Sequence, residues 1–299
     1  MNNYQHLLKK ILVDNSYIQD GQRCIEMRET RSGNCASIFG HFMEWDLRKG
    51  FPAVTTKKLA FNAVMGELLW FLAGKTDLKS LREFTGLDED AWTIWTQDCE
   101  RWNKTMGMDS DSLGRVYGYQ WRSWYEGITD KQVDQVWNLI ERIKGDPMSR
   151  YHLVSAWNAG EIDGGEMMAL PPCHYAFQVF VTENGELDLM WHQRSVDTFL
   201  GLPFNIASYA ALAHIIAKLT GKRVRYLKCS LGDTHIYEQH LDPVMELLSR
   251  EPLPSPRFVM PEFSTLKDLE RLTAKDFKLR DYGHHGVIKG KLTVGGDDE

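Results

Sequence analysis

Segments with helical periodicity and segments with strand periodicity alternate along this chain without a regular βαβ rhythm. Apolar spacing predicts helices over residues 4–14, 58–73, 131–144 and 205–220, the last of them capped by Asn205 and ended by Gly221. Two-residue alternation predicts strands over residues 37–46, 152–157, 174–182, 186–192 and 223–230, with a hairpin turn at Glu183-Asn184-Gly185. This interleaving favours the α+β class in one domain, residues 1–299. Residues 85–114 have weak periodicity and are predicted to be a variable insertion or a small subdomain.

The overall charge limits the kinds of partner. The chain has 35 Lys and Arg against 41 Asp and Glu, which gives a formal net charge of −6. A mildly acidic chain is a poor general binder of nucleic acid, so an anionic ligand must be held by a local arginine cluster. No apolar run approaches the roughly 20 residues of a membrane span, and the N-terminal segment lacks the pattern of a secretory signal. We therefore expect no membrane association.

The chain contains five cysteines, Cys24, Cys35, Cys99, Cys173 and Cys229. An odd number without a CxxC spacing argues against a disulfide framework and against a zinc site, so no metal is expected. A cytoplasmic location is the simplest expectation for free thiols. Such thiols are usually small buried hydrophobic groups, unless local chemistry activates one of them.

One cysteine lies in the segment Leu170-Pro171-Pro172-Cys173-His174, where two prolines hold the backbone extended before a predicted strand. A thiolate is a good nucleophile, and the positive charge of Arg150 or Arg194 would lower the pKa of the Cys173 thiol. The alternative is a buried structural cysteine, which the residues alone favour. His174 alternates to the other face of the strand, so we expect it to be a hydrogen-bonding group near the site and not the base of a Cys–His pair.

Glu67 lies within the apolar pattern of the predicted helix 58–73. A charged residue in such surroundings is rarely buried without a partner. It either reaches solvent or an arginine, or it lines an active-site cavity, and periodicity leaves both possibilities open.

Two further clusters combine residues that suit a phosphate, a pyrimidine and a sugar. Arg194 and Ser195 suit a phosphate, because a guanidinium can bind two oxygens at once. Asn205 suits a pyrimidine edge, because its amide both donates and accepts. His235 and Tyr237 are two positions apart on a strand, so they face the same way and suit a sugar hydroxyl. Each of these residues could equally be a surface residue or a helix cap.

Together these clusters closely resemble the thymidylate synthase family. The matching stretches follow one order between about residues 4 and 294: residues 51–58, 67–72, 116–118, 120–122, 154–158, 169–174, 193–197, 201–209, 232–237 and 288–291. Any single stretch would be weak, whereas so many in order make a chance match implausible. The resemblance implies a mixed β-sheet flanked by helices, with sheets packing across a homodimer.

The resemblance also implies a reaction between dUMP and 5,10-methylenetetrahydrofolate. Cys173 would add to C6 of the uracil, so that C5 becomes nucleophilic and attacks the methylene group of the folate. Asn205 would donate to the enolate at O4 and select uracil over cytosine. Tyr117 would help to remove the C5 proton, and Glu67 would organise water and proton transfers. Hydride from the folate would then give dTMP and dihydrofolate.

The binding residues follow from the same resemblance. Arg194 and Ser195 would hold the phosphate together with Arg31, and Arg150 would reach across the dimer to the partner's phosphate. His235 and Tyr237 would bind the deoxyribose hydroxyl. The residues implied at the folate are Lys57 near its tail, Asp197 at the pterin, Trp95 and Gly201.

Several positions depart from the family pattern. Arg150-Tyr151 stands where two adjacent arginines are usual, so one charge near the phosphate is lost. The early arginine loop, residues 31–36, is one residue shorter than usual. Trp95-Thr96 stands in place of Trp-Asp, and Gly114-Arg115 in place of Gly-Pro, where Arg115 would replace the missing positive charge.

Water access would decide between two products. The family pattern ends near Val294, so residues 295–299 form a tail that could prevent closure of the site. If water entered, the same intermediate would be hydrated to a 5-hydroxymethyl nucleotide. A dUMP hydroxymethylase is therefore the main alternative, and Asn205 argues against the corresponding dCMP enzymes. A catalytically inactive nucleotide- or RNA-binding relative and a cysteine hydrolase are further alternatives.

Overall fold

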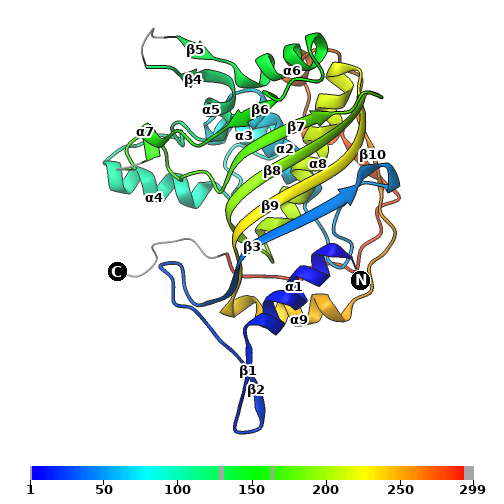
Figure 1. The fold of residues 1–299 in the computed structure, drawn as a ribbon. Coiled ribbons are helices and arrows are strands. Elements are labelled where there is room, and N and C mark those ends of the chain that lie inside the picture. The colour runs from blue at the N-terminus through cyan, green and yellow to red at the C-terminus, as the bar shows by residue number, and fades with distance from the viewer. Residues whose placement is uncertain (1, 128–130, 163–164, 293–299) are drawn as a thin grey trace.

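A five-stranded mixed sheet forms the centre of the fold (Figure 1). The computed structural model describes residues 2–127, 131–162 and 165–292. The strand order is β3 (Cys35–Asp46), β9 (Arg223–Tyr237), β8 (Glu186–Asp197), β7 (His174–Val181) and β6 (Leu153–Ser155). β8 and β9 are parallel, whereas the other neighbours are antiparallel. The expected α+β class, with a mixed sheet flanked by helices, is confirmed.

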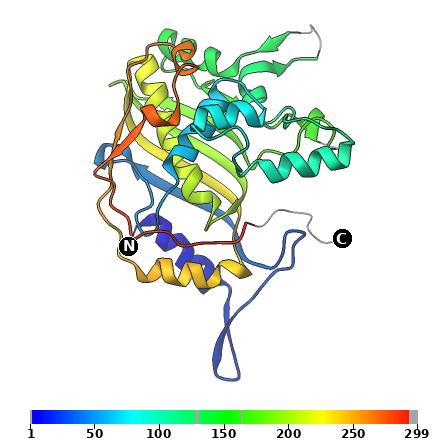
Figure 2. The same cartoon turned by 180° about the vertical axis from the view of Figure 1, so that it is seen from behind.

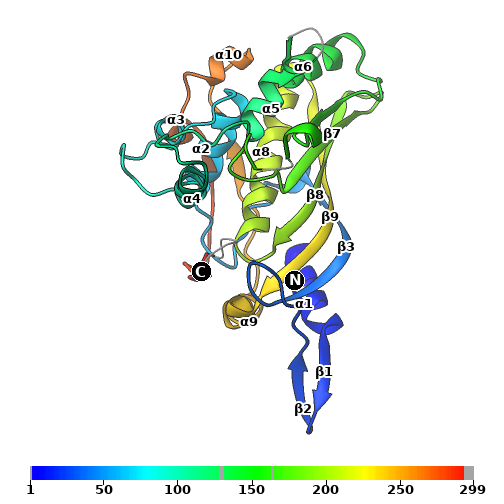
Figure 3. The same cartoon turned by 90° about the vertical axis from the view of Figure 1, so that its left-hand side faces the viewer.

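Helices gather on one side of this sheet, and its other face is uncovered in the single chain (Figure 3). The longer helices are α1 (Asn3–Asp14), α2 (Phe61–Leu72), α3 (Leu78–Thr85), α4 (Thr96–Met106), α5 (Tyr117–Ser123), α6 (Gln135–Gly145), α8 (Gly201–Thr220) and α9 (Leu241–Ser249). The short helical elements are η1 (Leu47–Lys49), α7 (Ala159–Ile162), η2 (Glu238–His240), α10 (Leu266–Leu269) and η3 (Ala274–Asp276). Three ribbons lie outside the sheet: β1 (Ser16–Gln19) with β2 (Gln22–Ile25), β4 (Trp124–Tyr125) with β5 (Gln132–Val133), and β10 (Arg257–Val259) with β11 (Lys278–Arg280).

α8 crosses behind the sheet and connects β8 to its parallel neighbour β9. Contrary to the expectation from the sequence, this helix is long and apolar enough to span a membrane by length and composition, but 78% of its apolar window is buried inside the protein. Its packing against β8, β9 and α2 therefore identifies it as the central core helix.

The predicted start of this helix is wrong. α8 begins at Gly201, so Asn205 lies in its second turn and does not cap it. The Asp197 carboxylate accepts the backbone N–H groups of Phe199 and Leu200, at 2.8 and 3.2 Å, and turns the chain before the helix. Pro203 sits in the first turn, where a missing N–H costs nothing. At the other end Gly221 adopts the left-handed conformation that ends the helix, as predicted.

Other predicted segments differ in extent. The predicted helix 131–144 begins only at Gln135, because Asp134 caps it and residues 132–133 pair as β5. β9 continues to Tyr237, well beyond the predicted end at residue 230, and so places His235 and Tyr237 on a strand. The region 85–114 contains α4, and its interpretation as a variable insertion remains a prediction.

A narrow arm, formed by β1 and β2, projects from the body of the protein after α1 (Figure 1). The arm is closed at its base by the backbone N–H of Glu26, which donates to the carbonyl of Asn15 at 2.7 Å. Asn15 is itself anchored, because its side-chain amide donates to the carbonyl oxygens of Ile11 and Ser37. The chain therefore returns from the arm to a fixed point beside β3.

The close approach of α2 and α3 gives a stability prediction. A Cβ at Gly66 of α2 would lie 2.2 Å from Thr85 Oγ1 and 2.6 Å from Thr85 Cα. We expect Gly66→Ala to lower the free energy of unfolding by about 1–3 kcal/mol, because the helices must separate. Gly145→Ala is the matched control, since a Cβ there meets nothing within 4 Å. Denaturant unfolding of both variants checks the difference, and equal stabilities would contradict it.

Candidate active site

Cys173 lies immediately before β7 and is held by its own backbone. Its N–H donates to the Tyr117 hydroxyl at 2.7 Å, and its carbonyl accepts the N–H of Arg194 at 2.9 Å. Burial raises the pKa of the Cys173 thiol, while the positive charge of Arg194 opposes this shift. The Arg194 Nη2 atom lies 4.0 Å from the Cys173 sulfur. The thiol is therefore kept protonated until a positive group or a bound substrate favours its thiolate.

The two prolines before Cys173 hold Arg194 in place. Its guanidinium donates to the carbonyl oxygens of Pro172 and Pro171, at 2.9 and 3.1 Å, and lies 5.6 Å from the ring of Trp157. Arg194 remains exposed, so its free edge can meet a bound anion. Gly232 on β9 permits this arrangement, because a Cβ there would lie 2.6 Å from the Arg194 carbonyl. Ser195 follows on β8 and is partly buried.

Glu67 lies on α2 among buried apolar residues. Its carboxylate accepts the indole N–H of Trp95 at 2.7 Å, and burial raises the pKa of Glu67 to about 7. The Tyr117 ring packs 6.0 Å from the ring of Trp95. Of the two possibilities for Glu67, the geometry therefore favours the carboxylate that lines the site, poised to hold or release a proton near neutral pH.

His174 does not contact the Cys173 thiol. Its ring stacks on Tyr117 with 4.2 Å between centroids, and its Nδ1 is 2.8 Å from the hydroxyl of Tyr209. Burial lowers the pKa of His174 to about 3, so the ring is neutral. This agrees with the expectation of a hydrogen-bonding group near the site.

The amide of Asn205 is oriented by Gln193. The Gln193 side chain accepts the indole N–H of Trp191 at 3.1 Å, so its own amide nitrogen points to Asn205 Oδ1, at 3.2 Å. A hydrogen bond accepted at Oδ1 leaves the NH2 group of Asn205 as the donor for a ligand. Asn205 can therefore donate to a carbonyl oxygen such as O4 of uracil.

Asp197 lies at the end of β8, beside the start of α8. Burial would raise the pKa of its carboxyl, but hydrogen bonds with His240 and the backbone of residues 199 and 200 lower it overall. Lys57 lies in the same wall, with its ammonium donating to the Phe199 carbonyl at 2.5 Å, and burial lowers the pKa of Lys57 to about 8. Gly201 follows at the first position of α8. Lys57 is buried and occupied by this contact, so its expected role at the folate tail remains a prediction.

His235 and Tyr237 share one side of β9, with their rings 4.8 Å apart. Burial raises the pKa of Tyr237 to about 12, and the nearby side chain of Ser32 opposes this shift. Arg31, the neighbour of Ser32, is exposed at the same place. The two residues expected at the sugar and one arginine expected at the phosphate are thus close together.

Arg150 lies apart from these residues. It is exposed in the loop before the edge strand β6, and within the described residues it has no side-chain hydrogen bond or ion pair. Arg115 does not replace the missing charge, because its guanidinium is paired with Glu161 and lies against the rings of Tyr119 and Tyr125. The tail 295–299 falls outside the described residues.

Comparison with known proteins identifies the family. The family profile described as thymidylate synthase matches residues 2–294. The chain belongs to the thymidylate synthase family. It is 54% identical to the "Probable thymidylate synthase" of Escherichia phage T5, over 90% of this chain and 94% of that protein. It is 44% identical to the thymidylate synthase of Enterobacteria phage T4, over 98% of this chain and all of that one.

The crystal structure of thymidylate synthase from T4 phage has the same fold. It matches with a TM-score of 0.86 and 43% sequence identity, covering 98% of this chain and 100% of that chain. The thymidylate synthase of Symbiobacterium thermophilum is 41% identical over 97% of this chain. The protein is thus a one-carbon methyltransferase-type enzyme of this family.

Sequence reasoning missed several residues of this thymidylate synthase site. Tyr209 binds His174 and stacks on Trp191, with 5.1 Å between ring centroids. Its position four residues after Asn205 on one helix face was the available signal. Asp233 and His240 were missed because each acts on another side chain, His235 and Asp197 respectively.

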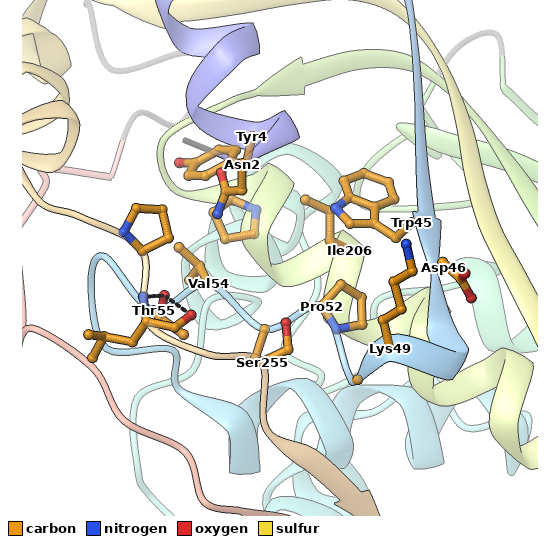
Figure 4. Close-up of a pocket in the computed structure, with 15 residues that line it drawn as sticks. Asn2, Tyr4, Trp45, Asp46, Lys49, Pro52, Val54, Thr55, Ile206 and Ser255 are labelled. Carbon is orange, nitrogen blue, oxygen red and sulfur yellow. Dashed lines mark hydrogen bonds between the residues drawn. The ribbon is translucent and has the colours of Figure 1, made fainter.

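A separate cavity of about 160 Å³ lies between the start of α1, the end of β3 and residues 252–255 (Figure 4). Lys49, Trp45 and Asn2 are among its lining residues, and Cys173 is not. This cavity is therefore not the active site. Within residues 2–127, 131–162 and 165–292, no group of three His, Cys, Asp or Glu side chains could hold a metal ion.

The raised pKa of Glu67 predicts how stability depends on pH. The folded protein keeps a proton on Glu67 up to about pH 7, whereas an unfolded chain releases it near about 4.3. The folded state binds more protons in this window, so wild-type stability falls as the pH rises through it. We expect Glu67→Gln to be more stable than the wild type at pH 8, by on the order of 1 kcal/mol, and similar to it at pH 5.

Denaturant unfolding at the two pH values measures this difference. The exposed Glu100 on α4 supplies the matched control, because Glu100→Gln removes a carboxylate from the surface. A gain in stability that is equal at pH 5 and pH 8, or shared by E100Q, would contradict the assignment.

The contact between Arg194 and Cys173 predicts thiol reactivity. We expect Arg194→Met to slow alkylation of Cys173 by iodoacetamide at pH 8 about fivefold to tenfold, because loss of a nearby positive charge raises the thiol pKa. Peptide mass spectrometry measures the modified fraction of Cys173. Arg223→Met, on the neighbouring strand β9, should leave the rate unchanged. A rate unaffected by R194M would show that the charge does not act on the thiol.

Proposed function

We propose that this enzyme converts dUMP to dTMP, with 5,10-methylenetetrahydrofolate as the one-carbon donor and reductant, through a covalent adduct of Cys173. The observation that carries this proposal is the pairing of Cys173 with Arg194. The arginine lies 4.0 Å from the sulfur and keeps a free edge for a phosphate. A nucleophile and an anion-binding group are thereby fixed next to each other, as a nucleotide substrate with an anionic 5′-phosphate requires.

The first step would use Cys173 and Asn205. The sulfur forms a bond to C6 of the uracil, and the electron pair of the C5–C6 double bond moves to C5 and O4. The NH2 group of Asn205, oriented by Gln193, donates to O4 as negative charge develops there. Because an amide NH2 cannot accept from an exocyclic amino group, the same contact selects uracil over cytosine.

The proton steps would use Tyr117 and Glu67. C5 forms a bond to the one-carbon unit of the folate, and the C5 proton must then leave so that the bond from this carbon to the folate nitrogen can break. The Tyr117 hydroxyl is held by the Cys173 N–H, directly beside the nucleophile. Glu67 can exchange a proton near neutral pH, because burial raises its pKa to about 7. The released tetrahydrofolate then gives a hydride to the methylene carbon left on C5 and becomes dihydrofolate, while the C5–C6 double bond reforms and the sulfur leaves C6 as its thiolate.

The folate would bind between the α8 side of the site and Trp95. Asp197 is a carboxylate for the N–H groups of the pterin, and Trp95 offers a buried aromatic wall. Gly201 leaves room at the start of α8, since the nearest atoms to a Cβ there would be Asn205 Oδ1 and Asp197 Cβ, at 3.9 and 4.0 Å. The buried ammonium of Lys57 lies near enough to Asp197 to interact with its negative charge.

We further propose that the active form is a homodimer. Large apolar side chains are exposed on strands of the sheet: Phe39 at 89%, Phe42 at 55%, Phe180 at 56% and Leu153 at 49%. Exposed large apolar side chains at both edges of the sheet favour association. A groove beside it is lined by Trp157, Tyr175 and Arg194 among others, so a second sheet on this face could bring Arg150 to the partner's phosphate site. The free state of all five cysteines supports a cytoplasmic location.

Product analysis tests the proposal. The enzyme is incubated with dUMP and 5,10-methylenetetrahydrofolate, the nucleotide is identified by mass, and dihydrofolate is followed by absorbance. We expect a 5-methyl product with an equal amount of dihydrofolate, and no product from Cys173→Ser. A 5-hydroxymethyl product without dihydrofolate would indicate the hydroxymethylase. If 5-fluoro-dUMP and folate failed to trap Cys173, the protein would be an inactive nucleotide binder. If ester substrates formed an acyl-enzyme, the protein would be a cysteine hydrolase.

A further inference from the structure

Residues 26–35 connect the β1–β2 arm to β3 and lie beside the carboxyl end of β9. The backbone of Arg28 pairs with that of Cys35 through two hydrogen bonds, of 2.9 and 3.0 Å. At the other end, the carbonyl of Asn34 accepts the N–H of Glu238 at 2.9 Å, and its amide donates to the Glu238 carboxylate at 3.1 Å. The segment is therefore fixed to the end of β9.

The Arg28 side chain begins a chain of contacts that ends at His235. Its guanidinium pairs with one oxygen of the Asp233 carboxylate, and the other oxygen of Asp233 lies 3.1 Å from His235 Nδ1. The side chains are 54%, 27% and 8% exposed in that order, so the contacts lead from the surface inward. Arg28 and Asp233 are 205 positions apart in the sequence.

The same segment also supports Tyr237. The side chain of Ser32 lies near that of Tyr237, whose ring lies edge-on to His235. One short segment thus approaches, directly or through Asp233, both side chains expected at the sugar hydroxyl.

The chemistry of these contacts fixes what His235 offers to a ligand. A carboxylate at Nδ1 holds the proton on that nitrogen and leaves Nε2 for the ligand. Arg28 compensates the charge of Asp233, which has a lowered pKa through its hydrogen bonds with His235 and Arg28. The other titratable groups near His235 are Tyr237, Asp197, which is its register partner on β8, and Cys35 on β3, which is the register partner of Tyr237. Without Arg28, the Asp233 carboxylate would be held by His235 alone. Both side chains could then rotate away from the orientation that directs Nε2 of His235 to the ligand.

We propose that Arg28 and Ser32 are positioning residues that orient His235 and Tyr237 toward the 3′-hydroxyl of the bound nucleotide. This inference rests on the proposed function, because dUMP carries its phosphate on the 5′ carbon and so has one free sugar hydroxyl. The segment 26–35 therefore confers selectivity for a nucleotide with that hydroxyl, although neither Arg28 nor Ser32 needs to touch it.

This positioning role is tested by combining substitutions in the protein with a nucleotide that lacks the 3′-hydroxyl. Binding of dUMP and of 2′,3′-dideoxyuridine monophosphate, which lacks the 3′-hydroxyl, is measured by calorimetry for the wild type, Arg28→Gln and Ser32→Ala. We expect the Kd for dUMP to rise about threefold to tenfold in R28Q, and by less in S32A. The Kd for the dideoxy nucleotide should stay within twofold, because it has no hydroxyl for the oriented side chains to bind.

Arg257→Gln is the matched control. Arg257 forms a surface pair with Asp281 in the β10–β11 ribbon, with both side chains 68% exposed, so its loss should change neither Kd. Thermal unfolding of each variant verifies the fold. If R28Q weakened both nucleotides equally, or neither, the inference would be overturned. If the wild type did not bind dUMP, the proposed function would be overturned. If the wild type bound dUMP and R28Q bound it with the same Kd, only the inference about Arg28 would be overturned.

Discussion

The parallel pairing of β8 and β9 is the contact on which the rest of the site depends. It sets Ser195 beside Asp233 and Asp197 beside His235, so two strands present their polar residues at the same edge. Parallel strands need a long crossover, and here the crossover is α8, which carries Asn205 to that edge. In open α/β sheets, ligands commonly bind outside the carboxyl ends of parallel strands, and the polar residues here lie at such an end. The parallel pairing of β8 and β9 therefore determines the positions of both the core helix and the polar site.

Several groups in the site have protonation states in the folded protein that would be less favourable in water. Glu67, His174 and the Cys173 thiol are each held by burial closer to their neutral forms than they would be in water. Hydrogen bonds from Trp95 and Tyr209 supply partners, so these groups are buried without being isolated. The arrangement costs stability, and in return the protons at the reacting centre can move near neutral pH.

Much of this could be read from the sequence, and the remainder has identifiable physical reasons. The hairpin, the core helix and the extended backbone before Cys173 follow from local spacing and from proline and glycine, so they were predictable. Asn205 was misread as a cap, because a polar residue before an apolar run looks the same whether the helix starts there or one turn earlier. The contacts of Arg28 with Asp233 and of His240 with Asp197 join distant positions, for which a single sequence carries no periodic signal.

The pairing of β3 with β9 has a consequence for how the protein folds. Its register pairs Cys35 with Tyr237, so a strand near the start of the chain can pair only with a strand that lies about 200 residues later in the sequence. Figure 2 shows the C-terminal segment running past α9, where the carbonyl of Lys291 lies 2.8 Å from Nε2 of His240. Pairings between such distant segments form slowly, because loop-closure entropy opposes them. The sugar side of the site should therefore be among the last regions to become native during refolding, after the local hairpin of β7 and β8.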